Sequence, residues 1–136
     1  MAHNENKMKQ ILSIEQMKHL KDLGVNTSDA NMCWMKDSEE NRFLSVNDEY
    51  CYEMSHLSPV PAYTLQDILD KLPCFIGNEV LTIQKLAYSY TCLYMEPYTR
   101  SMIKITESNE LIDAAYEMLC WCIEEGYVKV ENKKQD

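Results

Sequence analysis

The chain has 136 residues, 46% hydrophobic and 26% charged, a composition typical of one globular domain rather than of a disordered chain. The 22 acidic residues outnumber the 13 basic residues and give a net charge of −9. This excess argues against proteins that hold nucleic-acid phosphates or anionic lipid through clusters of Lys and Arg, so we expect no direct nucleic-acid or membrane binding.

The first predicted element is an amphipathic helix over residues 13–23. Ser13 and Gln16 have the spacing of a capping box, in which each side chain accepts a hydrogen bond from the other residue's backbone amide. Apolar residues then recur at helical spacing as far as Gly24, a residue that tolerates the left-handed conformation common after a helix. The pattern therefore indicates both ends of this helix.

A polar turn separates two short apolar runs in the next part of the chain, at 32–35 and 42–46. This arrangement predicts a β-hairpin. Residues 50–54 are predicted as a further short strand. Pro59 and Pro61 restrict the backbone to extended conformations, so they mark a connection before the next element.

The apolar period then changes from helical to alternating. Thr64 and Asp67 cap a predicted helix over residues 65–72, which ends at Pro73. Apolar and polar residues alternate in the segment that follows, which is typical of strands that bury one face. Short turns divide it, so it predicts an antiparallel meander over about 80–106, with strands at 80–86, 88–95 and 101–106.

The last predicted element is a helix over residues 110–125, with Ser108 or Asn109 as its cap and Gly126 after its end. Its apolar residues form a continuous stripe that needs another surface to cover it. Residues 127–130 are predicted to pack as a final short strand or as a tail.

Together these elements predict one α+β domain over residues 1–136. A small antiparallel sheet, with the 80–106 meander at its centre, packs against the C-terminal helix at 110–125, because each presents an apolar face. The two shorter helices cover the edges of the sheet or its other end. Residues 1–10 and 132–136 are predicted to be flexible tails.

Six cysteines raise the question of disulfides or a metal site. The first ten residues lack the apolar segment of a secretion signal, and no apolar run has the length of a membrane span, so we expect a cytoplasmic protein with reduced thiols. The one close pair, Cys120 and Cys122, would lie about 200° apart around a helix and cannot bind one ion from one face. No metal or other cofactor is therefore predicted.

The sequence holds no recognised catalytic motif. His3, His19 and His56 have no partner at the spacing of a metal site or a triad, and three glycines cannot build a phosphate-binding loop. We therefore predict that the protein is not an enzyme, and we assign no catalytic residue. A small enzyme with an unfamiliar site is an alternative, which a deep pocket lined by convergent titratable groups would support.

Tyrosine is frequent, with 9 residues in the chain. The alternating pattern places Tyr88, Tyr90 and Tyr94 on one face of one predicted strand. Such rings either cover the sheet against the terminal helix or form an exposed cluster at a protein interface, since tyrosine combines a large apolar area with a polar tip. Both uses are open, and we take the three tyrosines as candidate interaction residues.

The negative charge is concentrated in two segments. Residues 23–80 carry −7 and residues 109–136 carry −4, whereas residues 1–22 and 81–108 each carry +1. If the carboxylates of the first acidic segment form one patch, the protein suits the role of an acidic immunity protein or DNA mimic that blocks a basic nuclease or DNA-binding protein. The candidates for this patch are Asp37, Glu39, Glu40, Asp48, Glu49 and Glu53.

Three segments resemble small uncharacterised proteins encoded in the genomes, prophages and mobile elements of gut anaerobic bacteria. They are L-S-I-E-Q-M-K-H-L-K-D-L-G-V at 12–25, V-P-A-Y-T-L-Q-D-I-L-D-K-L-P at 60–73 and L-I-D-A-A-Y-E-M-L-C-W-C-I-E-E-G-Y at 111–127. The similarity covers most of the chain in order, but its motifs are structural and carry over no catalytic residue. The resemblance implies a bacterial or phage origin. We therefore expect a non-enzymatic interaction or accessory protein of a phage or mobile element, with a protein partner or with self-association.

Overall fold

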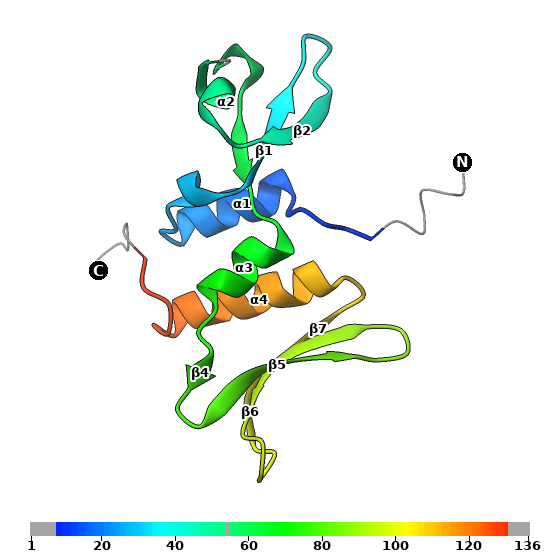
Figure 1. Cartoon of the computed structure of the whole chain (residues 1–136), viewed down its shortest axis with the longest axis vertical. Coiled ribbons are helices and arrows are strands. Elements are labelled where there is room, and N and C mark those ends of the chain that lie inside the picture. Colours follow the sequence, from blue (N-terminus) through cyan, green and yellow to red (C-terminus); the bar gives the residue numbers. More distant parts are fainter. Residues whose placement is uncertain (1–7, 54, 131–136) are drawn as a thin grey trace.

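The computed structural model describes residues 8–53 and 55–130. Its α+β fold has two antiparallel sheets at opposite ends, with the helices α1 (Ile14–Asp22), α3 (Leu65–Lys71) and α4 (Leu111–Glu124) between them (Figure 1). The predicted class is confirmed, and the first sheet is an addition to the single sheet expected around the meander. None of the helices in this described part is long and apolar enough to cross a membrane.

Helix α1 begins where the sequence predicts it. The Ser13 hydroxyl accepts a 3.1 Å hydrogen bond from the Gln16 backbone amide, and the Gln16 side chain accepts one of 2.9 Å from the Ser13 amide. Gly24 follows the helix with a φ of 103°, in the left-handed region that glycine adopts at no steric cost. Both predicted end signals are therefore confirmed.

The first sheet has the strand order β2-β1-β3. Strands β1 (Met32–Lys36) and β2 (Arg42–Val46) form the predicted hairpin. Strand β3 (Val60–Ala62), predicted only as an extended connection, pairs with the other side of β1. Pro61 is tolerated because β3 is an edge strand, where a missing N–H need not break a ladder hydrogen bond.

The strand predicted at 50–54 is wrong, because Glu49–Glu53 form the short helix α2 and residue 54 lies outside the described part. The Asp48 carboxylate and the Asp48 carbonyl oxygen both accept hydrogen bonds from the Cys51 backbone amide, at 3.4 and 3.1 Å. These bonds favour a helical turn. Five residues are too few for the apolar period to separate helix from strand. Two 3-10 turns, η2 (Thr27–Asp29) and η3 (Ser55–Leu57), complete these connections.

Helix α3 confirms the predicted cap. The Thr64 hydroxyl accepts a 3.2 Å hydrogen bond from the Asp67 amide, and the Asp67 carboxylate accepts one of 2.9 Å from the Thr64 amide. The same buried carboxylate accepts hydrogen bonds from the backbone and side-chain amides of Asn31. Asp67 therefore joins the start of α3 to the residue that precedes β1.

The predicted meander is confirmed as β5 (Glu79–Lys85), β6 (Tyr90–Met95) and β7 (Met102–Ser108). A short strand, β4 (Phe75–Ile76), pairs with β5 on its other side. The order β4-β5-β6-β7 places β7 at an edge of this sheet. The register between β6 and β7 shifts near Met95, where a β-bulge interrupts the pairing.

Helix α4 packs on one face of this second sheet, as its apolar stripe predicts (Figure 1). The predicted caps are wrong: Glu110 is the N-cap, and its side chain makes no capping hydrogen bond. Instead, the Glu110 carboxylate accepts a 3.2 Å hydrogen bond from the Lys9 amide, and the Ser108 hydroxyl accepts one of 3.3 Å from the Glu110 amide. The start of α4 is therefore bonded to the N-terminal segment.

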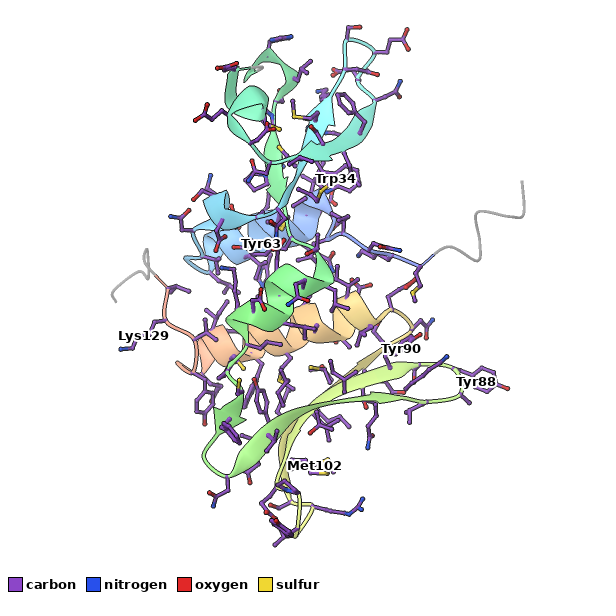
Figure 2. All side chains as sticks on the ribbon, in the orientation of Figure 1. Trp34, Tyr63, Tyr88, Tyr90, Met102 and Lys129 are labelled. Atoms are coloured by element: carbon purple, nitrogen blue, oxygen red, sulfur yellow. The ribbon has the colours of Figure 1, made fainter. Side chains whose placement is uncertain are left out.

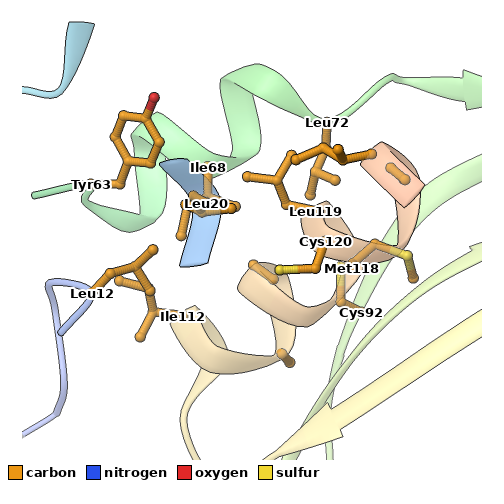
Figure 3. Close-up of a cluster of buried hydrophobic side chains, with 14 of the residues drawn as sticks. Leu12, Leu20, Tyr63, Ile68, Leu72, Cys92, Ile112, Met118, Leu119 and Cys120 are labelled. Atoms are coloured by element: carbon orange, nitrogen blue, oxygen red, sulfur yellow. The ribbon is translucent and has the colours of Figure 1, made fainter. Parts of the chain in front are cut away.

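The main core lies where α1, α3 and α4 meet, and it continues between α4 and the second sheet (Figure 3). Its fully buried side chains include Leu12, Leu20, Ile68, Met118 and Leu119. Each large apolar side chain buried in this way stabilises the fold by about 1.5–3 kcal/mol. A second, smaller cluster lies in the first sheet and α2 and consists of Cys33, Met35 and Cys51, with Leu57 packed against it.

The ends of the described chain contact the rest of the molecule. Lys9, inside the predicted tail 1–10, forms an ion pair with Asp113 of α4 at 2.8 Å. At the other end, Val128 and Val130 pack against the main core as a tail rather than as a strand. The remaining parts of the predicted tails, residues 1–7 and 131–136, lie outside the described residues.

All six cysteines lie within the described residues and are free thiols. Five are buried, and Cys74 is exposed. Burial raises the pKa of the Cys92 thiol to about 12 and that of Cys122 to about 11, so both are protonated near neutral pH. Over 8–53 and 55–130, no group of three or more His, Cys, Asp or Glu side chains is arranged to hold a metal ion.

Candidate interaction surface

The second sheet has one covered face and one open face. Successive residues of β6 point to opposite sides, and Cys92 and Tyr94 belong to the core under α4. Leu93 points the other way, between Thr82 of β5 and Ile105 of β7. No helix of the described chain covers this side, which we call the open face (Figure 1). This face of the sheet therefore has no helix over it, although the Leu93 side chain at its centre is only 1% exposed.

Apolar side chains are exposed along β7. Met102, Ile103 and Ile105 are 54, 43 and 49% exposed. Ile105 lies opposite Leu93, and Met102 lies opposite Met95, so both belong to the open face. Figure 2 shows Met102 on the side of the sheet away from α4. Single exposed apolar residues are common on proteins, but three within four positions of an edge strand form a patch.

The structure separates the three candidate tyrosines. Tyr94 is fully buried, and its hydroxyl donates a 2.7 Å hydrogen bond to the Pro73 carbonyl oxygen. Burial raises the pKa of this hydroxyl, and Tyr94 is a core residue rather than part of an exposed surface. Tyr90 is half-buried at the start of β6. Tyr88 lies in the β5–β6 turn, is 93% exposed and extends away from the molecule (Figure 2).

A further exposed tyrosine, Tyr98, is not among the interaction residues that the sequence pattern predicts. It is 92% exposed in the β6–β7 turn, at the opposite end of β6 from Tyr88. The Glu96 carboxylate shapes this turn by accepting hydrogen bonds from the Thr99 and Tyr98 amides. These bonds, mainly those from Thr99, lower the pKa of Glu96. Pro97, a residue typical of turns, could have identified Tyr98, because few neighbours surround a side chain at a hairpin tip.

The six candidate carboxylates all lie in the acidic lobe, our name for residues 32–53 and 55–62, which include β1, β2, α2, η3 and β3. This lobe lies at the opposite end of the molecule from the second sheet (Figure 1). The structure therefore brings the six residues to one end. Asp37, Glu39 and Glu40 belong to the β1–β2 turn, and Asp48, Glu49 and Glu53 belong to α2 and the residue before it.

Half of these carboxylates take part in local structure. Asp37 accepts two backbone hydrogen bonds within its own turn, at 2.8 and 2.9 Å. Glu40 forms an ion pair with Lys36, and Asp48 accepts a bond at the start of α2. A carboxylate that is already hydrogen-bonded or neutralised offers less attraction to a basic partner. These contacts weaken the case for an acidic mimic.

Helix α4 places a carboxylate beside the edge strand. Its Ala114 carbonyl oxygen accepts a 2.7 Å hydrogen bond from the Thr106 hydroxyl, and its Trp121 ring lies 5.9 Å from the Lys104 ammonium. Glu117 lies three residues after Ala114 and four before Trp121, so it shares their side of the helix, and it is exposed. Strand β7 is therefore flanked by the open face on one side and by an acidic helix on the other.

A polar pocket of about 290 Å³ brings titratable groups together. The Asp29 carboxylate accepts hydrogen bonds from the Tyr63 hydroxyl at 2.8 Å and from the Lys71 ammonium. Burial raises the pKa of Tyr63. Burial also opposes ionisation of Asp29, but the bonds from Lys71 and Tyr63 outweigh it and lower the pKa of Asp29. Neither shift moves a group toward neutral pH, where general acids and bases act, so this is the arrangement of a structural network.

A more apolar pocket of about 360 Å³ lies beside Tyr90, between residues 8–11 and the starts of α3 and α4. Its volume is at the lower end for small-molecule sites. Two charged residues in its lining, Lys9 and Glu110, are bonded within the protein, Lys9 to Asp113 and Glu110 to the Lys9 amide. The pocket therefore provides space for a small apolar group, without a charged side chain placed to orient it.

Comparisons with protein-family models, with curated proteins and with solved structures found no match for this chain. The resemblance to proteins of gut anaerobes therefore stays a prediction. Among the surfaces of the described residues, the open face and β7 combine exposed apolar area with a strand edge that no other described strand pairs with.

Proposed function

We propose that this protein is a non-enzymatic interaction protein that binds a protein partner through the open face of its second sheet. The observation that carries the proposal is the exposed apolar patch of Met102, Ile103 and Ile105 on β7. Protein interfaces concentrate apolar and aromatic side chains and are depleted in charge at their centre. The biological setting that we propose is that of an accessory protein of a bacterial mobile element or phage.

Two further features support this surface over the others. Tyr88 and Tyr98 extend from opposite ends of the sheet, and exposed tyrosines supply large contact area with a hydrogen-bonding tip. Residues 81–108, which hold β6, β7 and most of β5, are also nearly neutral, with a charge of +1 in a chain of −9. This near-neutral charge matches the depletion of charged residues at the centre of protein interfaces.

The acidic mimic is the second candidate function. It is favoured by the position of six carboxylates at one end of the molecule, in the acidic lobe. The local bonds of Asp37, Glu40 and Asp48 reduce the electrostatic attraction of the acidic lobe for a basic nuclease. The exposed apolar residues of the sheet can contact a partner without breaking bonds within the protein, so we rank the sheet first.

Site-specific photo-crosslinking tests the proposal. The photoreactive residue p-benzoylphenylalanine replaces Tyr98 or Ile103 in the full chain, and it replaces the exposed Lys18 of α1 as a matched control. We expect one adduct of the same size from both sheet positions in cells that express the chain, with none from Lys18. Adding Ile105→Lys, which places a charge in the patch, should remove this adduct while the circular dichroism spectrum is unchanged.

Two outcomes would contradict the proposal. Adducts of equal yield at Lys18 would show that contact is not localised to the sheet. An adduct at the sheet positions that persists with Ile105→Lys would show that the apolar patch does not hold the partner. An adduct confined to a probe at Glu53 and lost at high salt would support the acidic mimic instead, because exposed charge pairs are screened by salt.

A further inference from the structure

We propose that the partner adds a strand to β7, using an extended segment in which apolar residues alternate with Lys or Arg. This inference rests on the proposed function and specifies the chemistry of the partner. Three features at β7 support it: the edge that no described strand pairs with, the apolar side chains on its open side and the carboxylates of α4 on its other side.

Strand β7 has one neighbour among the described strands, β6. The backbone N–H and C=O groups of an edge strand that face away from its neighbour are free to pair with another chain. The pairing with β6 is regular from Lys104 to Ser108, so the bulge near Met95 disturbs only the beginning of β7. Most of the seven-residue strand is therefore regularly paired, as an edge that accepts a partner strand needs to be.

Proteins usually protect an exposed edge with charged side chains, a proline or a covering segment. On the open side, β7 carries one charged residue near its end, Glu107, which accepts a hydrogen bond from the Ser89 hydroxyl, and it otherwise presents Met102 and Ile105, both about half exposed. Side chains of an added strand alternate between the two faces of the sheet. Those on the open side would extend the row of Leu93 and Ile105, where apolar cross-strand neighbours are favoured. The partner segment should therefore carry an apolar residue at every second position.

The intervening positions of the partner would face α4. Glu117 and Glu124 are exposed there, on either side of Trp121 at the three- and four-residue spacing of one helix face. Lys104 is the basic residue of β7, and it lies over the Trp121 ring. A basic residue directly opposite Lys104 would meet like charge, whereas beside Glu117 and Glu124 opposite charge favours Lys or Arg and disfavours Asp or Glu.

A second copy of the chain fits this edge less well. Antiparallel pairing of two β7 strands would bring two α4 helices, each with Glu117 and Glu124, to the same junction. Like charges placed together oppose association. The charge of α4 therefore favours a basic segment from a different protein.

Synthetic peptides test the inference on the full chain. The probe is the capped peptide Lys-Ile-Lys-Val-Lys-Ile-Lys, and its controls are the same peptide with Glu in place of Lys and the Lys peptide N-methylated at alternate residues. N-methylation keeps charge and composition but removes the donors that strand pairing needs. We expect the Lys peptide to slow amide hydrogen exchange in β7, and we expect neither control to do so.

Paired variants test the role of α4. Replacing both carboxylates, with Glu117→Gln and Glu124→Gln, should weaken binding of the Lys peptide by about tenfold, as expected for the loss of two exposed ion pairs. Glu15→Gln, on the exposed side of α1, is the control and should leave the affinity unchanged. Both variants retain helix-forming residues at exposed positions, so the fold should be preserved.

The outcomes separate this inference from the proposed function. Equal binding of the Glu peptide, or no protection of β7 by the Lys peptide while the photo-crosslinks at Tyr98 and Ile103 persist, would overturn strand addition and leave the interaction role intact. Loss of those crosslinks as well would contradict both the strand addition and the interaction role. The amide protection of β7 could instead rise with the concentration of the chain when no peptide is present. That result would assign the edge to a second copy of the chain and overturn the proposal of a basic partner segment.

Discussion

The Thr106 hydroxyl donates a 2.7 Å hydrogen bond to the carbonyl oxygen of Ala114. This contact joins the edge strand β7 to α4 in a buried position, since Thr106 is 9% exposed and Ala114 is fully buried. The helix thereby supports β7 from one side of the sheet. On the open face no helix of the described chain contacts β7, so the edge strand is held by this bond, by the contact of Lys104 with Trp121 and by pairing with β6.

Removing this hydroxyl should destabilise the protein. Thr106→Val keeps the shape of the side chain but loses the hydrogen bond, and we expect the free energy of unfolding to fall by about 1 kcal/mol in urea denaturation. Thr91→Val is the matched control on the open side, because Thr91 is also buried but its hydroxyl reaches only the Gln84 side chain, at 3.4 Å. An equal loss at both positions would contradict the special role of the bond to α4.

The separate positions of the tyrosines predict different responses to the same substitution. Tyr94→Phe removes a buried hydrogen bond to Pro73 and should lower the free energy of unfolding by about 1 kcal/mol. Tyr88→Phe, at a 93% exposed side chain, should change it by less than about 0.5 kcal/mol. Thermal or urea unfolding measures both. Equal effects would show that the two rings do not differ in burial.

The network of Asp29 predicts a dependence of stability on pH. The pKa of Asp29 in the folded protein lies below its ordinary value of 3.8. A carboxyl group with a lowered folded pKa contributes stability that is complete above its unfolded pKa and is lost as pH falls through the folded pKa. Asp29→Asn should therefore lower the free energy of unfolding near neutral pH, and its difference from the parent should shrink below about pH 4.

Urea unfolding at a series of pH values measures this difference. The control is the double variant with Lys71→Met, which removes the ammonium that bonds the Asp29 carboxylate. In that background Asp29→Asn should have a smaller effect at neutral pH, because part of the interaction is already gone. A difference between parent and Asp29→Asn that stays constant from neutral to acid pH would contradict the lowered pKa.

The thiols should divide into two classes by reactivity. Cys74 is exposed, whereas the other five cysteines are buried and the pKa of Cys92 is raised to about 12. Because the thiolate is the reactive form, we expect one thiol to react rapidly with a water-soluble disulfide reagent in the folded protein. Mass spectrometry identifies the labelled residue. Cys74→Ser should abolish the rapid phase, and rapid labelling of Cys92 would contradict the packing of β6 under α4.

Local signals made much of the fold predictable. The caps of α1 and α3 depend on residues three positions apart, Ser13 with Gln16 and Thr64 with Asp67, so the chain reveals them without knowledge of its partners. The pairing of β3 with β1 depends on residues far apart in sequence. The prolines around Val60 suggested a connection because nothing local reveals the edge position that tolerates Pro61.

The candidate surface was less predictable for the same reason. A difference of two residues in the start of β6 places Tyr88 in a turn and leaves Tyr90 and Tyr94 in the strand. Alternation correctly groups Tyr90 and Tyr94, but burial depends on where α4 lies above them, which no local pattern gives. The exposure of Ile105 likewise follows from β7 being an edge, a property of the whole sheet.

The small cluster of Cys33, Met35 and Cys51 is separate from the main core. The acidic lobe shares few buried side chains with the main core, and it is tied to the remainder by contacts such as the 2.9 Å bond from the Trp34 indole to the Leu12 carbonyl oxygen. Segments with few buried apolar contacts open at a lower free energy than the whole protein. We therefore expect the acidic lobe to open locally at a lower free energy than the helices and the second sheet. These latter elements should hold β7 in a single conformation.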